Sequence, residues 1–294
     1  MNSCLYRIRD RFHPLNHLRR HAFGRKILLA MDIPVWTKLP GVDWNVRVRL
    51  VSHASAFLLP GGVEPAILRL FSAVAREIGI RSFWDVGANV GYYTWLTKSL
   101  APKAAGRMFE PDADNAALIR ETMHRTPLNG IVLREVAISD TQSRRRFVRD
   151  EVAGSTGGIK ETLGTFSQDQ WGVVGPTITV NTVTLDQERA RTGAVDLLKI
   201  DVEGHEEAVV RGGLKTIEKD QPILIFECSH GGSEITGVLS GLGYWVGDAE
   251  RISDDLGGAT NFLALPPRHR ALRNRLRKAW PPEKSRFGRA RDLG

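Results

Sequence analysis

Carboxylates follow four apolar stretches of the sequence, at points where the strands of a predicted sheet would end. The first stretch leads into DVGANVG, residues 85–91, in which Asp85 stands directly before the glycines at 87 and 91. The acids that follow the next three stretches are Glu110, Asp140, and the pair Asp201 and Glu203. Ligands of open α/β sheets bind outside the carboxyl ends of the strands, so these acids are the first candidates for a ligand site.

The glycine turn could in principle serve a dinucleotide, because such a turn places a pyrophosphate beside a helix N-terminus. Asp85 would then lie close to two negative charges. Two unit charges about 4 Å apart interact by about 4 kcal/mol at an effective dielectric constant near 20. The spacing also differs, since Gly87-x-Asn89-x-Gly91 does not match G-x-G-x-x-G. The sequence therefore disfavours a dinucleotide.

S-adenosylmethionine suits both the glycines and the acid, because it lacks phosphate and carries a sulfonium and an α-ammonium group. An acid at this turn would attract that positive end, and glycines allow the backbone to approach a ligand closely. Glu110 is expected to accept both ribose hydroxyls, and Asp140 is expected at the adenine amino group. The predicted cofactor-binding residues are Asp85, Gly87, Asn89, Gly91, Glu110, Ala137 and Asp140.

The same motifs resemble those of the FkbM-type methyltransferases. The matching stretches are DVGANVGYYT (85–94), FEPDADNAALI (109–119), VAISD (136–140), TVTLD (182–186), VDLLKIDVEGHEEAVVRGG (195–213) and ILIFE (223–227). The resemblance implies a class I methyltransferase, with a Rossmann-like, doubly wound α/β sheet of about seven strands and S-adenosylmethionine as cofactor. It also implies O-methylation of a hydroxyl on a sugar, glycolipid or natural-product acceptor.

Methyl transfer to a hydroxyl needs an aligned acceptor and a base. The fourth strand end, KIDVEGHE at 199–206, offers Asp201, Glu203 and His205 as predicted catalytic residues. Imidazole titrates close to neutral pH, which makes His205 a candidate base. It is equally open that His205 stands at the start of a helix and forms a hydrogen bond with the backbone. Asp201 and Glu227 together are candidate ligands for a divalent metal such as Mg²⁺. They could equally bind sugar hydroxyls, or one of them could pair with Lys199.

Alternating strand and helix patterns would position these residues in a mostly parallel sheet. Strands are expected at 81–86, 106–110, 131–138, 195–200, 222–227, 244–247 and 262–265, and helices at 63–78, 92–100, 112–125, 205–217 and 234–242. A further strand pair is expected within 35–51. Strands at 145–149 and 177–185 should flank a glycine-rich insertion, 150–175, which is predicted to act as a lid over the acceptor.

The charge distribution divides the chain into a globular body and two basic ends. Residues 1–30 carry a charge of +6 and residues 266–294 a charge of +8, so the body is acidic although the chain carries +8 in total. The predicted organisation is a basic extension at 1–34, a strand pair and helix at 35–80, the S-adenosylmethionine-binding domain at 81–266, and a basic, partly disordered tail at 267–294.

The basic ends could contact an anionic membrane or nucleic acid, although a solvated tail is the simpler interpretation. RALRNRLRKAW (270–280) spaces Leu272, Leu276 and Trp280 by four, as in a membrane-surface helix. Nucleic acid is disfavoured because the body is acidic. The alternatives to a small-molecule or carbohydrate-like hydroxyl acceptor are an RNA methyltransferase that uses the basic ends, and a non-catalytic nucleoside-binding protein.

Cysteine content and hydropathy predict a cytoplasmic location, with peripheral contact of the basic ends at the inner membrane surface. Cys4 and Cys228 are the two cysteines and cannot form a disulfide framework, so free thiols in a reducing compartment are expected. No uncharged apolar run reaches the roughly 18 residues that span a bilayer.

Overall fold

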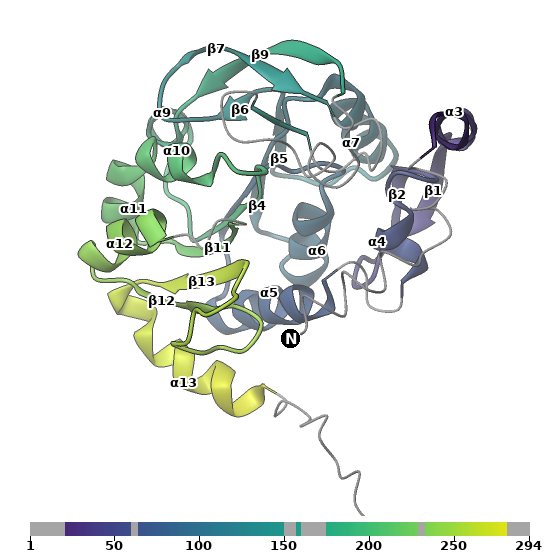
Figure 1. Cartoon of the computed structure of the whole chain (residues 1–294). Helices are drawn as coiled ribbons and strands as arrows, with labels where there is room; N and C mark the ends of the chain where they lie inside the picture. Colours follow the sequence, from purple (N-terminus) through teal and green to yellow (C-terminus); the bar gives the residue numbers. More distant parts are fainter. Residues whose placement is uncertain (1–20, 60–63, 150–156, 160–174, 229–232, 281–294) are drawn as a thin grey trace, which may run out of the picture.

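Seven short strands form the central sheet of the protein (Figure 1). Their spatial order is β12 (Trp245–Asp248), β13 (Asn261–Leu265), β11 (Ile223–Glu227), β10 (Leu197–Ile200), β3 (Ser82–Val86), β4 (Ala105–Phe109) and β5 (Ile131–Arg134). β13 is antiparallel to both neighbours, and the remaining pairs are parallel. The predicted doubly wound sheet of about seven strands is confirmed. The structure, a computed structural model, describes residues 21–59, 64–149, 157–159, 175–228 and 233–280.

Helices cover both faces of this sheet, because successive strand residues point to opposite sides. On one face lie α5 (Pro65–Ile78), α6 (Tyr92–Leu100), α7 (Ala113–Arg125) and α13 (Arg270–Ala279), and on the other α9 (Leu185–Thr192), α10 (Glu206–Arg211), α11 (Leu214–Asp220) and α12 (Ser233–Gly241). Phe83 joins the core under α5. Its neighbour Trp84 packs on Phe109 in the opposite core, with ring centroids 5.8 Å apart.

The predicted N-terminal strand pair is present. β1 (Pro34–Lys38) and β2 (Asn45–Arg49) are antiparallel, and alternation buries Val46 and Val48 of β2 completely. These valines share a core with Leu118 and Ile119 of α7, so the pair packs on the main body. Two further helices, α3 (Ala22–Met31) and α4 (Ala54–Leu58), flank the pair (Figure 1).

The strand expected at 131–138 divides between two sheets. Its second part, β6 (Ala137–Ile138), leaves the central sheet and pairs with β9 (Thr177–Val183). β9 also pairs antiparallel with β7 (Ser143–Val148), as expected for strands that flank an excursion, and β7 pairs with β8 (Gly158–Ile159). Of the predicted lid, 150–156 and 160–174 lie outside the described residues.

The helix expected at 205–217 forms as two helices, α10 and α11, separated by Gly212 and Gly213. A Cβ at Gly212 would lie 2.0 Å from the carbonyl oxygen of Ser139. The break therefore lets this turn contact the chain just after β6.

The amphipathic helix expected near the C-terminus exists, but its apolar face is part of the core. Leu272 and Leu276 of α13 are 1% and 2% exposed and pack in the core that α5 covers. Trp280 donates from Nε1 to the carbonyl oxygen of Glu250 over 2.7 Å. The membrane-surface interpretation of this helix is therefore wrong, because its apolar residues contact protein. The basic segments 1–20 and 281–294 lie outside the described residues.

None of the helices in the described parts of the chain is long and apolar enough to cross a bilayer. Cys228 takes part in no disulfide within the described residues, and Cys4 precedes them.

Candidate cofactor and acceptor site

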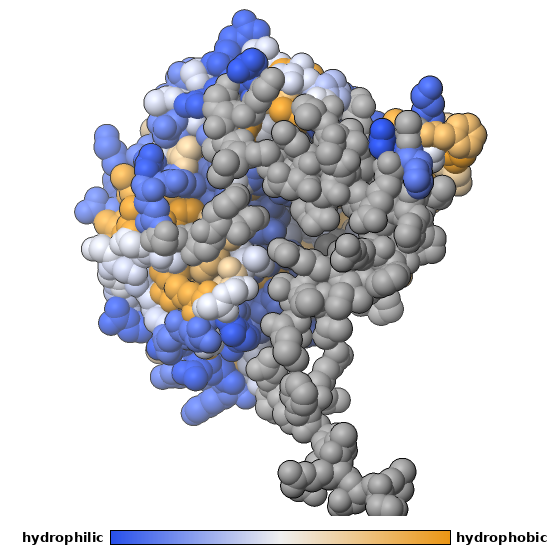
Figure 2. Space-filling model, in the orientation of Figure 1, coloured by the Kyte–Doolittle hydropathy of each residue, from blue (hydrophilic) through white to orange (hydrophobic). Residues whose placement is uncertain are grey.

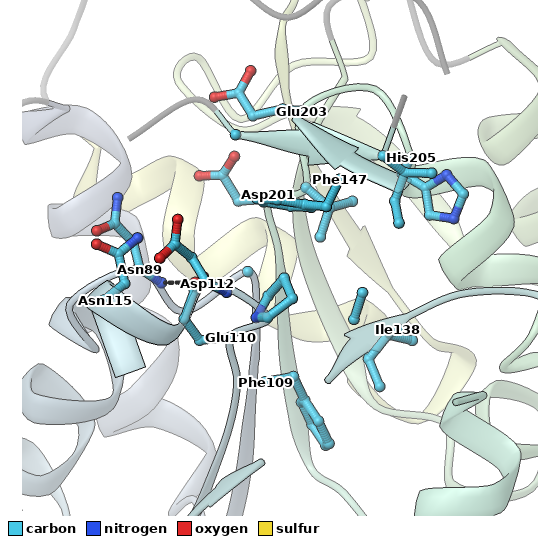
Figure 3. Close-up of a pocket in the computed structure, with 16 residues that line it drawn as sticks. Asn89, Phe109, Glu110, Asp112, Asn115, Ile138, Phe147, Asp201, Glu203 and His205 are labelled. Carbon is cyan, nitrogen blue, oxygen red and sulfur yellow. Dashed lines mark hydrogen bonds between the residues drawn. The ribbon is translucent and has the colours of Figure 1, made fainter. Parts of the chain in front are cut away.

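A cavity lies at the carboxyl ends of β3, β4 and β10, where the small sheet of β6 to β9 adjoins the central one (Figure 3). It is lined by Gly87, Asn89, Phe109, Glu110, Pro111, Asp112, Asn115, Ala137, Ile138, Phe147, Gly157, Ile159, Asp201, Val202, Glu203 and His205. Four of these side chains are carboxyl groups, and no lysine or arginine is among the described lining residues. This electrostatic surface suits a ligand with positive charge and disfavours a phosphate.

The glycine turn is built for close contact between three strand ends. Gly87 has φ 77°, and a Cβ there would lie 1.9 Å from the carbonyl oxygen of Asp201. The N–H groups of Gly87 and Ala88 both donate to the carbonyl oxygen of Phe109, over 3.0 and 3.1 Å. A side chain at position 87 would therefore separate β10 from the turn. Gly91, with φ 80°, lies at the start of α6 against the indole of Trp95.

Glu110 lines the cavity with a carboxyl group that the backbone holds in place. Its Oε2 accepts from the N–H of Asn89 over 2.7 Å, and its Oε1 accepts from the N–H of Asp112 over 2.9 Å. Burial raises the pKa of Glu110 to about 8, although both backbone donors lower it. The side chain of Asn115 is a third donor to this carboxyl group. A carboxylate offers about four acceptor positions, so about one remains for a ribose hydroxyl, and a second becomes available if Asn115 turns to the ligand.

Asp85 is the predicted cofactor residue that the structure places most differently. Its carboxyl group is 1% exposed and is absent from the cavity lining. Oδ2 accepts from the N–H of Thr94 over 3.0 Å and from its Oγ1 over 2.9 Å. Burial raises the pKa of Asp85 to about 7, against the opposing effects of Thr94 and Lys199. The structure therefore corrects the expectation of direct contact: Asp85 fixes the first turn of α6, which follows the glycine loop.

Asp140 also lies away from the cavity. The chain leaves the central sheet at β6, and the exposed Asp140 pairs with Arg145 over 3.0 Å. Partial burial acts to raise the pKa of this carboxyl group, but the hydrogen bonds from Ser139 and Thr141, together with the charge of Arg145, outweigh it and lower the pKa. The expected contact of Asp140 with the adenine amino group is not supported, whereas Ala137 does line the cavity.

The three predicted catalytic residues all line the cavity, but in different surroundings. Asp201 accepts from the buried Lys199 over 3.0 Å. Glu203 has φ 54°, in a loop shaped by the Glu206 carboxylate, which accepts from Val202 and Gly204. His205 is 3% exposed, and its Nε2 lies 2.9 Å from Oγ of Ser139. His205 is thus anchored to the chain after β6, and Figure 3 shows it to the right of Asp201, with Glu110 below Asp201.

Asp201 and Glu227 are not arranged as a metal centre. Glu227 is absent from the cavity lining, and Lys199 supplies the positive charge beside Asp201. Within the described residues, no three His, Cys, Asp or Glu side chains gather as metal ligands would. The observed lysine pair is one of the alternatives that the sequence left open.

Several lining residues were missed by sequence reasoning. They are Phe109, Pro111, Asp112, Asn115, Ile138 and Val202, whereas Phe147, Gly157 and Ile159 lie in and beside the glycine-rich insertion that was expected at the acceptor. Asp112 caps α7 through the N–H of Asp114 at 2.8 Å and pairs with Arg149 at 2.7 Å. Phe109 and Asp112 flank Glu110 in the FEPD motif, so that motif was a usable signal. Phe147 and Ile159 come from the small sheet, whose position over the cavity no local motif indicates.

Comparison with protein families decides the identity of the domain. The family described as the methyltransferase FkbM domain matches residues 85–277. The chain belongs to the FkbM methyltransferase family. This confirms the resemblance seen in the motifs, and it supports S-adenosylmethionine as the cofactor.

Two relatives of this FkbM methyltransferase have descriptive names. The 2-O-methyltransferase NoeI of Sinorhizobium fredii is 36% identical over 143 residues, which cover 46% of this chain and 58% of the relative. The hexuronic acid methyltransferase AglP of Haloferax volcanii is 26% identical over 164 residues, which cover 55% of this chain and 61% of the relative. The match therefore spans less than two thirds of either relative.

Solved structures overlap with the fold in part. The methyltransferase FkbM from Methylobacillus flagellatus has a TM-score of 0.44 at 16% identity, covering 63% of this chain and 44% of that one. A SAM-dependent methyltransferase from Agrobacterium tumefaciens has a TM-score of 0.45 at 10% identity, covering 80% of this chain and 70% of that one.

Three observations indicate that the residues of this FkbM methyltransferase suit S-adenosylmethionine. Gly87 lines the cavity and, without a Cβ, lets the turn after β3 lie directly against the backbone of Asp201. Glu110 presents a fixed carboxyl group with about one free acceptor position. The described lining includes four carboxyl groups and no lysine or arginine, which suits a sulfonium, although Asp112 and Asp201 pair with Arg149 and Lys199 outside the lining. Phe109, Ala137 and Ile138 add an apolar wall on which a base could pack.

Proposed function

We propose that this FkbM methyltransferase transfers a methyl group from S-adenosylmethionine to a hydroxyl of a sugar or sugar-bearing acceptor. The single observation that carries the proposal is the acidic cavity in which Glu110 follows β4 and Asp201 follows β10, on either side of β3. Support for a sugar hydroxyl comes from the relatives, of which one is named a 2-O-methyltransferase and the other a hexuronic acid methyltransferase.

S-adenosylmethionine, when bound, supplies an electrophilic methyl group on a sulfonium that leaves as a neutral thioether. The residues of the chain bind the cofactor and orient the acceptor hydroxyl. Glu110 would accept hydrogen bonds from the ribose hydroxyls, and Gly87, which lines the cavity, would let the ligand approach the backbone. Asp201 accepts a hydrogen bond from the acceptor hydroxyl and takes its proton as the oxygen–carbon bond forms. Lys199 keeps the Asp201 carboxylate oriented.

Asp201 is preferred over His205 as the proton acceptor because of where each side chain is held. His205 is buried and bonded to Ser139, on the side of the cavity formed by β6. Asp201 directly follows β10, lines the cavity, and has a side chain that is 30% exposed. No step of the proposal passes through a metal ion, because Lys199 already balances Asp201.

The test is isotope transfer from S-adenosylmethionine labelled in its methyl group. Purified protein is incubated with a panel of methyl glycosides, oligosaccharide fractions and total RNA, and each fraction is analysed by mass spectrometry. We expect label in a carbohydrate hydroxyl, with little transfer by Glu110→Ala. Exposed Glu218, on α11, provides the control Glu218→Gln, which should transfer normally. Label confined to RNA, or no label with any carbohydrate, would overturn the proposal.

A further inference from the structure

A second group of polar side chains meets beyond Asp201 at the same edge of the sheet. Glu227 ends β11 and Asn261 begins β13, and the antiparallel register places these two residues opposite each other. Glu64 directly precedes α5 and reaches the same place. Lys199, in the neighbouring strand β10, lies beneath them. Residues 197 positions apart in the sequence therefore converge next to the candidate site.

Asn261 carries an unmatched hydrogen-bonding group in this cluster. Its Nδ2 donates to Oε1 of Glu64 over 2.9 Å, which orients the amide toward the acids. The residue is 3% exposed, yet Oδ1 has no hydrogen-bond partner among the described residues. Buried amide oxygens in folded proteins are nearly always paired, so an acceptor left open at a sheet edge indicates a donor from a ligand.

The cluster holds more acidic groups than basic ones, with the carboxyl groups of Asp201, Glu64 and Glu227 around the single lysine Lys199. Lys199 has a side chain that is 1% exposed, and it interacts with the carboxyl groups of Asp201, Glu64 and Glu227. Burial raises the pKa of Glu64, and it raises the pKa of Glu227 well above its ordinary value, with the negative charge of Asp201 acting in the same direction. The carboxyl groups of the two glutamates can form hydrogen bonds with the hydroxyls of a sugar.

We propose that Glu64, Glu227 and Asn261 form the subsite that binds the hydroxyls of an uncharged sugar ring beside the hydroxyl that is methylated. This inference rests on the proposed function and narrows its acceptor. Oδ1 of Asn261 accepts from one hydroxyl, and the two glutamates exchange hydrogen bonds with its neighbours. A sugar carboxylate is excluded here, because it would enter a group of several acids that share one lysine.

Discrimination between neutral and acidic sugars is the first test. Methyl hexosides and the matching methyl hexuronosides are offered with labelled S-adenosylmethionine, and binding is measured separately by saturation-transfer NMR on protein saturated with S-adenosylhomocysteine. We expect the neutral sugars to bind and react, with kcat/KM at least about tenfold above that of the hexuronosides, which corresponds to about 1.4 kcal/mol. Equal use of hexuronosides, or NMR binding of hexuronosides alone, would overturn the subsite.

Variants separate the subsite from the cofactor cavity. Glu227→Gln and Asn261→Leu should raise the acceptor KM at least about tenfold while the S-adenosylmethionine Kd stays within about twofold. Glu227→Gln should also narrow the gap between neutral sugars and hexuronosides. Exposed Asn181, on β9, gives the matched control Asn181→Leu, which should leave both constants unchanged.

The outcomes distinguish failure of the subsite from failure of the proposed function. If sugars are methylated but both variants keep the wild-type acceptor KM and sugar preference, the subsite is wrong and the proposed function stands. If no carbohydrate is labelled and NMR detects no sugar, both are wrong. A variant that loses cofactor affinity and thermal stability is replaced by Glu64→Gln, which preserves the side-chain shape.

Discussion

The backbone N–H of Asn89 donates to Oε2 of Glu110 over 2.7 Å, so the glycine turn after β3 is tied to the end of β4. Asn89 has φ 54°, a backbone conformation that most residues with side chains avoid. The contact holds the turn in that conformation and at the same time fixes the carboxyl group expected to bind ribose. Together with the N–H groups of Gly87 and Ala88, which donate to the carbonyl oxygen of Phe109, this hydrogen bond joins the two halves of the cofactor cavity.

Replacement of Glu110 should weaken cofactor binding specifically. Glu110→Gln places an NH₂ group against one of two backbone donors, and Glu110→Ala leaves both donors without this acceptor. Hydrogen bonds to a charged group contribute about 1.5–3 kcal/mol, so we expect the S-adenosylmethionine Kd to rise about 10- to 100-fold. Isothermal titration calorimetry measures this, with Glu218→Gln as control. Unchanged affinity in both Glu110 variants would remove Glu110 from the binding site.

Cofactor affinity should depend on pH through Glu110. Burial raises the pKa of this group to about 8, so the free protein keeps the proton at neutral pH. Ribose hydroxyls donate best to the ionised carboxylate, and binding should therefore release a proton below about pH 8. Affinity should rise with pH by at most about tenfold per unit and level off above about pH 8.

Calorimetry between about pH 6 and 9, in buffers of different ionisation enthalpy, detects the released proton. The ligand's own titration is common to all variants, so Glu110→Gln run in parallel isolates the contribution of the protein. The wild type and Glu110→Gln should differ in slope below about pH 8. Parallel profiles would show that Glu110 does not change its protonation on binding.

The close approach at Gly87 predicts an unequal effect of two glycine substitutions. Gly79 ends α5 with φ 60° and has open space where a Cβ would be, so Gly79→Ala meets backbone strain alone. That strain costs about 1–2 kcal/mol. Gly87→Ala adds a Cβ that would lie 1.9 Å from the Asp201 carbonyl oxygen.

We expect Gly87→Ala to lower the free energy of unfolding by more than Gly79→Ala does, and to abolish measurable S-adenosylmethionine binding. Gly79→Ala should bind the cofactor normally. Urea unfolding and calorimetry on the two variants provide the comparison. Equal stabilities together with normal binding in both would mean that the turn after β3 opens more easily than its contacts indicate.

Asp85 should act on stability more than on ligand affinity, because its carboxyl group bonds to Thr94 inside the protein. The folded pKa, about 7, exceeds the ordinary value of 3.8, so between these values the folded state holds a proton that the unfolded state has lost. This group's contribution to stability is therefore greatest in acid and declines as pH rises toward about 7.

Asp85→Asn should flatten that decline in urea unfolding measurements at several pH values, while the S-adenosylmethionine Kd changes less than in Glu110→Gln. Thr94→Val, which removes the hydroxyl donor from the same contact, is the companion variant. A loss of affinity in Asp85→Asn equal to that in Glu110→Gln, without any effect on stability, would restore the direct electrostatic role that the sequence suggested.

The sequence predicted the sheet well because the strand ends near the site carry motifs and the helices show apolar residues at helical spacing. It failed at Asp85 and Asp140 because a strand end does not say which way a side chain points. Asp85 shares its pleat face with Phe83 and meets α6, whereas Asp140 lies where the chain has already left the central sheet. The acidic environment expected for the cofactor is present, but Glu110, Asp201 and Glu203 provide it.

The convergence of Glu64 with Asn261 could not be predicted from local patterns. The two residues are 197 positions apart, and neither belongs to a recognisable motif. Their contact depends on the antiparallel placement of β13 beside β11, which brings the start of β13 to the carboxyl end of its neighbour. Such contacts follow from sheet topology, which the order of elements along the chain does not specify.

Asp201 and His205 should differ in their effects on turnover. Asp201→Asn keeps the shape of the side chain but cannot take a proton, so kcat should fall by about 10²–10⁴-fold while the S-adenosylmethionine Kd changes little. His205→Gln retains a polar group that can reach Oγ of Ser139 and should lower kcat far less. Single-turnover kinetics separate the chemical step from product release. A larger loss in His205→Gln, with a pH–rate profile that loses its acidic limb, would move the proton acceptor from Asp201 to His205.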